Sequence, residues 1–232
     1  MIDSANPTLV YPNGYKPGCL PRKSKPGEFC PMAADRIKIV PSGDWPAAAI
    51  ELGDNLRKHV PVVLDQNGYG SCATEATAGA IMLARAVQGL PFVQLNPLFI
   101  YHTTSGGSDS GSSIDDNLVF ARERGCASEA VWPRSKGFRA EPSEEAKEDA
   151  KKYRIEEFFD IANINEFVSS ELDAWAVVHG SNGHAILAVQ HMSTFPLILN
   201  SWGQWEDGGF GRWCSYNAIQ WSYGAFAVRV SS

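Results

Sequence analysis

The clearest hydrophobic pattern in the chain lies in residues 72–88. Apolar side chains recur there at steps of three and four residues, which is the period of a buried helical face. The recurring residues are Ala76, Ala80, Leu83, Ala84 and Val87. Ser71 stands where an N-cap belongs, and Gly89 followed by Pro91 supplies a C-terminal stop. The pattern therefore predicts a helix whose first residue is Cys72.

Further helices are predicted after this one. Asn96 before Pro97 is typical of a capped helix start, and helical spacing returns over residues 114–124. The charged residues 141–153 predict a solvated helix. Residues 105–113 contain only Ser, Gly and Asp, which predicts a surface loop placed to flank a binding groove.

From residue 175 the pattern changes to short apolar runs with a period of two, which is typical of β-strands. The runs are residues 175–178, 184–189, 195–199 and 225–230. Ser181-Asn182-Gly183 is a tight connection between the first two and predicts a hairpin. A helical first half and a sheet-rich second half predict an α+β fold of two subdomains with a cleft between them.

Residues 1–35 are rich in Pro and Gly and show little apolar periodicity, so we expect an extended arm. Its apolar anchors predict that it lies along the body of the protein. These anchors are Leu9, Val10, Tyr11, Tyr15 and Phe29. Residues 36–40 then form a strand-like run.

Composition narrows the class of protein. The 232 residues, 44% of them hydrophobic, suit one globular unit of one or two subdomains. A net charge of −6 without a long basic run argues against nucleic acid or an anionic membrane as the main partner. The amino terminus lacks the basic start and apolar run of a signal peptide, and no stretch approaches transmembrane length. We expect a monomer, cytoplasmic by default.

The chain has five cysteines, namely Cys19, Cys30, Cys72, Cys126 and Cys214. Reduced thiols are the default without a secretion signal, and Cys19 with Cys30 is the first candidate for a disulfide. Cys72 follows the glycine-rich turn of residues 65–71 and opens a predicted helix. The helix dipole and the unpaired N–H groups there favour a thiolate, the nucleophilic form. The alternative, a small buried hydrophobic residue, stays open at this point.

A nucleophilic cysteine needs a base, and the base usually needs a third group to hold its ring. His184 opens a strand directly after Gly183, and Asn200 ends the following apolar strand. If these strands pair across the intervening turn, the imidazole N–H can donate to the amide oxygen of Asn200. Trp202 is then placed to shield that hydrogen bond from water.

Three motifs in this order resemble those of papain-like cysteine peptidases. They are Gln66 six residues before Cys72, Gly183-His184-Ala185, and Asn200-Ser201-Trp202-Gly203. Residues 95–101 and 111–114 also look like segments of compact bacterial or viral members. The resemblance covers residues 36–232, thinly between 137 and 170, and leaves residues 1–35 as a separate arm.

The resemblance implies a papain-like fold. A helical half, about residues 60–140, would carry the nucleophile on a central helix, and a β-rich half, about residues 155–232, would carry the histidine and asparagine. It implies Cys72 as nucleophile and His184 as general base and acid. It further implies Asn200 as the group that orients the imidazole, and Gln66 as an oxyanion donor. The implied substrate-binding residues are Gly111, Ser112, Ser113, Ile114, Gly183 and Trp202.

Several residues depart from the family's pattern. Ala73 stands where a tryptophan is usual, and Tyr69 stands where a disulfide-forming cysteine is common. Glu75 is an uncommon carboxylate one turn below Cys72, where it either has a buried partner or raises the pKa of the thiol. The short connection over residues 178–184 leaves the leaving-group side of the predicted cleft more open.

These observations predict a cysteine endopeptidase that acts on polypeptides through a thioester acyl-enzyme, without a metal or organic cofactor. Two alternatives remain open. One is a catalytically inactive binding or particle-associated module, and the other is a transpeptidase or deamidase with the same triad. The arm is either a propeptide-like inhibitory strap or a structural belt.

Overall fold

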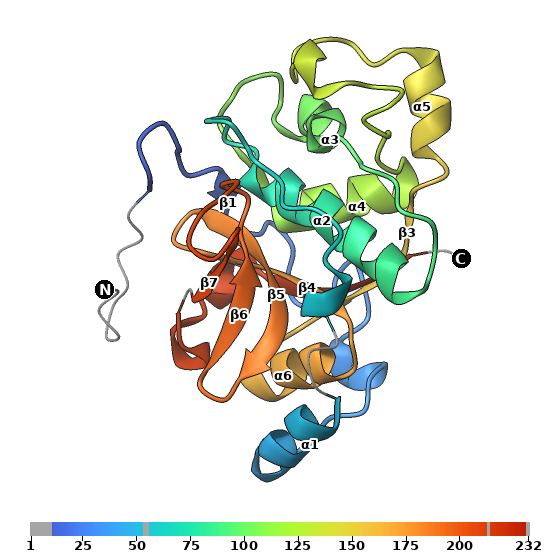
Figure 1. Cartoon of the computed structure of the whole chain (residues 1–232). Helices are drawn as coiled ribbons and strands as arrows, with labels where there is room; N and C mark the ends of the chain where they lie inside the picture. The colour runs from blue at the N-terminus through green and yellow to red at the C-terminus, as the bar shows by residue number, and fades with distance from the viewer. Residues whose placement is uncertain (1–10, 53–55, 213, 231–232) are drawn as a thin grey trace.

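The structure is a computed structural model that describes residues 11–52, 56–212 and 214–230. Its central element is helix α2 (Cys72–Val87), which packs against a six-stranded sheet (Figure 1). The predicted helix is confirmed to within one residue, and every residue from Cys72 to Ala84 is buried. Small side chains permit this close packing, and at Gly79 an added Cβ would lie 2.9 Å from Cδ1 of Leu187 on the sheet.

Three further helices complete the helical part of the molecule (Figure 1). They are α3 (Pro97–Thr104), α4 (Ile114–Glu123) and α5 (Glu144–Ala150). Helices α3 and α4 pack on α2, and α4 also contacts β3 (Ile155–Asp160). The predicted cap of α3 is confirmed, since Oδ1 of Asn96 accepts a hydrogen bond of 3.0 Å from the Leu98 N–H. α4 also forms as predicted. α5 is shorter than the helix predicted over residues 141–153, since only the seven residues Glu144–Ala150 are helical.

The sheet has the strand order β3-β8-β4-β5-β6-β7, and neighbouring strands run antiparallel. The strands are β3 (Ile155–Asp160), β4 (Ala176–Ser181), β5 (His184–Met192), β6 (Phe195–Leu199), β7 (Phe210–Arg212) and β8 (Ala225–Val230). The four predicted strands are confirmed. The predicted hairpin joins β4 to β5 through Asn182 and Gly183, whose φ angles of 51° and 76° suit a two-residue hairpin turn.

Two helices lie on the far face of the sheet. Helix α6 (Ile164–Leu172), which packs on β4 and β5, was absent from the sequence-based predictions. Helix α1 (Trp45–Leu52), which contacts α6, falls within residues 44–60, where the sequence favours a partly helical segment weakened by Gly53. The start of α6 does have a local signal, because Asn163 accepts from the Glu166 N–H in the manner of an N-cap. The strand expected over residues 36–40 does not form, since Val40 N–H donates to the Ser169 side chain rather than to a strand.

The arm is well integrated into the body from residue 21 onward. Arg22 forms an ion pair of 2.6 Å with the buried Asp160, and Ser24 donates a hydrogen bond of 2.9 Å to Asp115. Short β1 (Cys19–Leu20) pairs in parallel with β2 (Ser112–Ser113).

Six 3₁₀ turns complete the described residues, namely Ala33–Asp35, Ser42–Asp44, Arg57–His59, Arg134–Lys136, Tyr216–Ala218 and Trp221–Tyr223.

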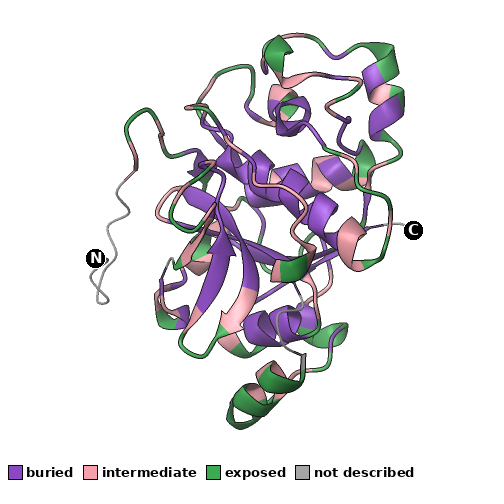
Figure 2. Ribbon diagram, in the orientation of Figure 1, coloured by how far each residue is buried: buried purple, intermediate pink, exposed green. Residues whose placement is uncertain are grey.

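Burial follows this layered arrangement, with α2 and strands β4, β6 and β8 mostly buried, and with β7 and α1 more exposed (Figure 2). One apolar cluster lies between the sheet and α2, and another between the sheet and α6.

All five cysteines are buried free thiols, so the suggested Cys19–Cys30 disulfide does not form. Cys19 instead packs against Gly180, where an added Cβ would lie 3.0 Å from the sulfur. None of the described helices is long and apolar enough to cross a membrane.

Two glycines that end helices allow a matched test of the packing around α4. Gly125 follows α4 with φ of +84°, and an added Cβ would lie 1.8 Å from the Ala150 carbonyl oxygen. Gly89 follows α2 with φ of +72° and has nothing within 4 Å of that position. We expect Gly89→Ala to lower the free energy of unfolding by about 1 kcal/mol through left-handed strain alone. Gly125→Ala should lower it by about 2–4 kcal/mol, because overpacking adds to that strain.

Urea unfolding of both variants measures the difference. Equal losses of stability would show that the close approach of α4 to the end of α5 carries no cost.

Candidate active site

Cys72 opens α2 with its thiol turned toward strand β5. The side chain is fully buried, and the backbone N–H groups of Ala185, Gly18 and Ala73 lie close enough to the sulfur to lower the pKa of the thiol. Ala185 directly follows His184 in β5. The packing of α2 on β5 therefore brings the candidate nucleophile and the candidate base together.

The hydrogen bonds around Asn200 fix the tautomer of His184. Oδ1 of Asn200 lies 2.8 Å from Nε2 of His184 and accepts a second hydrogen bond of 2.7 Å from the Ser201 N–H. Two donors on one oxygen determine which way the amide points. Nε2 consequently carries the imidazole proton, and Nδ1 carries the lone pair that can accept a proton from a thiol.

Trp202 has a role beyond the predicted shielding. Its ring lies 4.6 Å from the ring of His184, which places it over the His184–Asn200 pair. Its indole Nε1–H also donates to Oε1 of Gln66 at 3.0 Å. Ser201 donates its hydroxyl to the same oxygen at 3.1 Å. These two donors orient the Gln66 amide, and sequence reasoning missed both because neither lies in a motif with Gln66.

The amide nitrogen of Gln66 faces the glycine-rich turn and the arm. It donates to the Tyr69 carbonyl at 2.6 Å and, more weakly, to the Lys16 carbonyl at 3.4 Å. Gln66 itself is fully buried. The amide nitrogen of the predicted oxyanion donor therefore has a carbonyl oxygen of the arm within its reach.

Residues 11–20 of the arm pass directly over Cys72. The Gly18 and Cys19 N–H groups both donate to the Gly183 carbonyl, at 2.9 and 2.8 Å, and Gly18 accepts from the Ser112 N–H at 2.9 Å. At Gly111 an added Cβ would lie 2.4 Å from the Gly18 oxygen. Three of the predicted substrate-binding residues thus contact the arm.

The remaining predicted residues of this group lie next to the same segment. Ser113 pairs with Leu20 in the β1–β2 ladder, and Ile114 lies with the Cys19 sulfur around Gly180. Trp202 packs against the ring of Tyr11 at 5.5 Å.

Two polar contacts pin the arm to the turn before Cys72. Lys16 forms an ion pair of 2.5 Å with Asp109, whose other oxygen accepts 2.8 Å hydrogen bonds from the Gly70 N–H and the Tyr101 hydroxyl. Tyr15 donates its hydroxyl to Asp65 at 2.8 Å. Asp109 lies in the Ser, Gly and Asp loop, so this loop flanks the candidate site as expected.

Burial sets the protonation states of Cys72 and His184. It raises the pKa of the Cys72 thiol to about 12, against the opposing effect of the backbone N–H donors. It lowers the pKa of His184 to about 4, although the hydrogen bond to Asn200 opposes this shift. With the arm in place, both groups are therefore neutral at neutral pH.

Comparisons with known proteins rest on structure, since no family model and no curated protein matches the chain. Xylellain, a cysteine protease from Xylella fastidiosa, superposes with a TM-score of 0.70 at 20% identity, over 97% of this chain and 100% of xylellain. Procathepsin L2 from the Tenebrio molitor larval midgut gives 0.66 at 15% identity, over 94% and 79% of the two chains. The chain has a papain-like fold.

A Carica candamarcensis cysteine protease in complex with E-64 also has this fold. It superposes with a TM-score of 0.56 at 18% identity, over 78% of this chain and 98% of the protease. The predicted papain-like α+β fold is thus confirmed. No group of three or more His, Cys, Asp or Glu side chains in residues 11–52, 56–212 and 214–230 is arranged to hold a metal ion.

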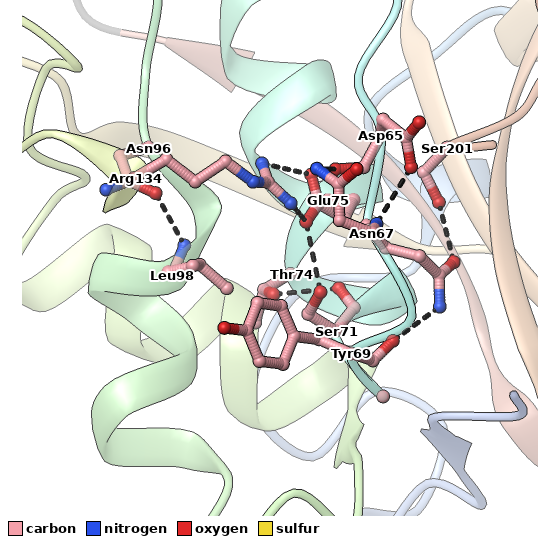
Figure 3. A network of polar contacts seen from close by, with 12 residues as sticks. Asp65, Asn67, Tyr69, Ser71, Thr74, Glu75, Asn96, Leu98, Arg134 and Ser201 are labelled. Atoms are coloured by element: carbon pink, nitrogen blue, oxygen red, sulfur yellow. Dashed lines mark hydrogen bonds and ion pairs between the residues drawn. The ribbon is translucent and has the colours of Figure 1, made fainter. Parts of the chain in front are cut away.

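Within the papain-like fold, Glu75 forms a buried ion pair below Cys72 (Figure 3). Arg134 reaches both carboxylate oxygens of Glu75, and the Ser71 hydroxyl donates to Oε1 at 3.0 Å. Burial raises the pKa of Glu75, while the charge and hydrogen bonds of Arg134 oppose that rise. Both expectations for Glu75 hold, because it has a partner and its charge also raises the pKa of Cys72, although burial is the larger cause.

Replacement of Arg134 by methionine tests the energetic role of this pair. Because Glu75 would remain buried without its cation, we expect Arg134→Met to lower the free energy of unfolding by about 3–5 kcal/mol. The double variant Glu75→Leu/Arg134→Met should lose clearly less, since no charge is stranded. Arg229→Met, which breaks a surface pair with Glu157 at 3.2 Å, should lose under about 1 kcal/mol.

Urea unfolding of Arg134→Met, Glu75→Leu/Arg134→Met and Arg229→Met measures whether the loss of stability comes from a stranded charge. A double variant as unstable as Arg134→Met would mean that the stability depends on the shape of these side chains and not on their charge.

Proposed function

We propose that this chain is a cysteine endopeptidase that hydrolyses polypeptides through a thioester acyl-enzyme. The Cys72 sulfur bonds to the scissile carbonyl carbon while its proton passes to Nδ1 of His184. The carbon–nitrogen bond then breaks, and His184 returns the proton to the leaving amine. Water attacks the thioester, with His184 again accepting a proton, and the acid product leaves with the thiol restored.

The observation that supports this proposal most strongly is the hydrogen bond from His184 to Asn200. It holds the imidazole as the Nε2–H tautomer, in which Nδ1 can act as base. The amide carries no charge, so it orients the ring without adding a carboxylate to the site. The solved structures that share the fold are described as cysteine proteases, which is consistent with this assignment.

Gln66 and the Cys72 N–H are proposed to bind the oxyanion of the tetrahedral intermediate. The hydrogen bonds that Trp202 and Ser201 donate to Gln66 hold the amide so that its nitrogen faces the site. A donor fixed in this way needs no reorganisation as the charge develops, and one such donor contributes about 3 kcal/mol in related chemistry.

The two parts of the arm are proposed to do different things. Residues 11–20 inhibit, because Gly18 lies at the sulfur of Cys72 while bonded to the Gly183 carbonyl, and the Lys16 carbonyl lies within reach of Gln66. Residues 21–35 form a belt, because Arg22 and Ser24 are bonded to Asp160 and Asp115 of the body. Several solved structures with this fold are described as procathepsins or a proform, which is consistent with an intramolecular inhibitor.

A single methyl group tests inhibition by the arm in the full chain. At Gly18 an added Cβ would lie 2.1 Å from the Gly70 carbonyl oxygen, and backbone cannot yield as a flexible side chain does. We expect Gly18→Ala to displace the segment and to raise kcat/KM for a fluorogenic peptide about ten-fold or more, which corresponds to about 1.4 kcal/mol. Gly43→Ala, at an exposed glycine with nothing within 4 Å and no positive φ, should leave turnover nearly unchanged.

Circular dichroism and thermal melting serve as the control that both variants fold. A folded Gly18→Ala protein with wild-type turnover would contradict inhibition by the arm, while leaving the catalytic assignment intact.

Labelling tests the nucleophile separately. We expect the epoxide E-64 to add once to the Gly18→Ala chain at neutral pH, because release of the arm hydrates the thiol and lets it ionise more readily. The adduct should be absent from Gly18→Ala/Cys72→Ala and retained in Gly18→Ala/Cys126→Ala, where Cys126 is another buried thiol. Intact-mass spectrometry reads each result.

An adduct that survives replacement of Cys72 would contradict its role as nucleophile. Absence of both an adduct and peptide turnover in the arm-displaced chain would favour a non-catalytic binding module.

A further inference from the structure

A cavity of about 300 Å³ lies among α3, α4 and α5, in the helical part of the molecule away from the sheet (Figure 1). It shares no lining residue with the candidate active site. Phe99 and Phe120 form an aromatic floor, with ring centroids 6.1 Å apart in an edge-on arrangement. A floor of this kind favours a ligand with a flat apolar body.

The rim of the cavity carries a surplus of positive charge. Four cationic side chains line it, from Arg124, Lys147, Lys151 and Arg154, with Glu141 as the one lining carboxylate. The two lysines are engaged, since Lys147 pairs with Glu144 at 2.9 Å and Lys151 pairs with Glu148. The surplus therefore resides on the two arginines.

Arg124 and Arg154 are poised to receive an anion. Across residues 11–52, 56–212 and 214–230, neither guanidinium has a carboxylate within ion-pair distance. Nε of Arg154 is buried without a hydrogen-bond partner. Both side chains lie near the end of α4, because Arg124 caps it and Cγ of Arg154 lies 3.3 Å from the Cβ position of Gly125.

We propose that this cavity binds the carboxylate of a small hydrophobic acid. The apolar body lies on Phe99 and Phe120, and the carboxylate pairs with Arg124 and Arg154, whose planar guanidinium groups match its geometry. The aromatic floor favours an acid with an apolar body over inorganic phosphate. The same chemistry is presented by a free arylalkanoic acid and by the carboxyl end of a peptide with an aromatic last residue.

Titration calorimetry with the full chain tests the site and does not depend on the proposed peptidase reaction. The probes are N-acetyl-L-phenylalanine, its uncharged amide, and acetyl-Ala-Ala-Ala-Phe with a free carboxylate. We expect saturable binding of the first probe and at least about ten-fold weaker binding of the amide, because the charge-assisted hydrogen bonds are lost. The peptide distinguishes the sources: if it binds as tightly as the first probe, peptide ends are ligands, and if it fails, the ligand is the free acid.

Two variants locate the binding. Arg154→Gln should weaken binding of N-acetyl-L-phenylalanine at least about ten-fold, and Arg212→Gln, at an exposed arginine on β7, should not change it. Thr103→Trp, at an exposed lining position, should abolish binding by filling the cavity while circular dichroism remains that of the wild type. The proposal is overturned by absence of saturable binding, by equal affinity for the amide, by tighter binding of inorganic phosphate, or by unchanged affinity in Arg154→Gln.

Discussion

The close packing of α2 on strand β5 is the constraint on which the rest of the molecule depends. It requires small residues on the helix, and at Gly79 even one extra carbon would press on Leu187. It also sets the start of the helix against the start of the strand, so that the Ala185 N–H reaches the sulfur of Cys72. The packing of α2 on β5 thus brings together Cys72 at the start of the helix and His184 at the start of the strand, although the two residues lie far apart in the chain.

Burial affects the protonation of Cys72 and His184 as well as access to them. A thiol and an imidazole removed from water both favour their neutral forms, which is the direction of the pKa shifts of Cys72 and His184. A neutral thiol is a poor nucleophile. The arm proposed to inhibit acts through the space that it occupies over Cys72, since its Gly18 N–H by itself lowers the pKa of the thiol and it is mainly burial that opposes ionisation.

Local signals explain which parts of this structure could be predicted from the sequence. The Asn96-Pro97 start of α3 and the Asn182-Gly183 turn each carry their geometry in adjacent residues, and both predictions were confirmed. Arg134 as the partner of Glu75 lies 59 positions away and has no periodic signal. The strand predicted over residues 36–40 does not form. An apolar run predicts burial, but it does not predict which neighbour will accept the backbone hydrogen bonds, and here Val40 N–H donates to Ser169.

The turn that precedes Cys72 is supported from two independent sides. From the body, Asp109 accepts the Gly70 N–H, and the Glu75 carboxylate accepts the Ser71 hydroxyl while paired with Arg134. From the arm, Tyr15 bonds Asp65 and Lys16 pairs with Asp109. Displacement of the arm removes only the second kind of support and frees the Gln66 amide from the Lys16 carbonyl. The turn can therefore keep its shape while the proposed oxyanion donor becomes available, so the proposed activation calls for removal of a segment and not for construction of a site.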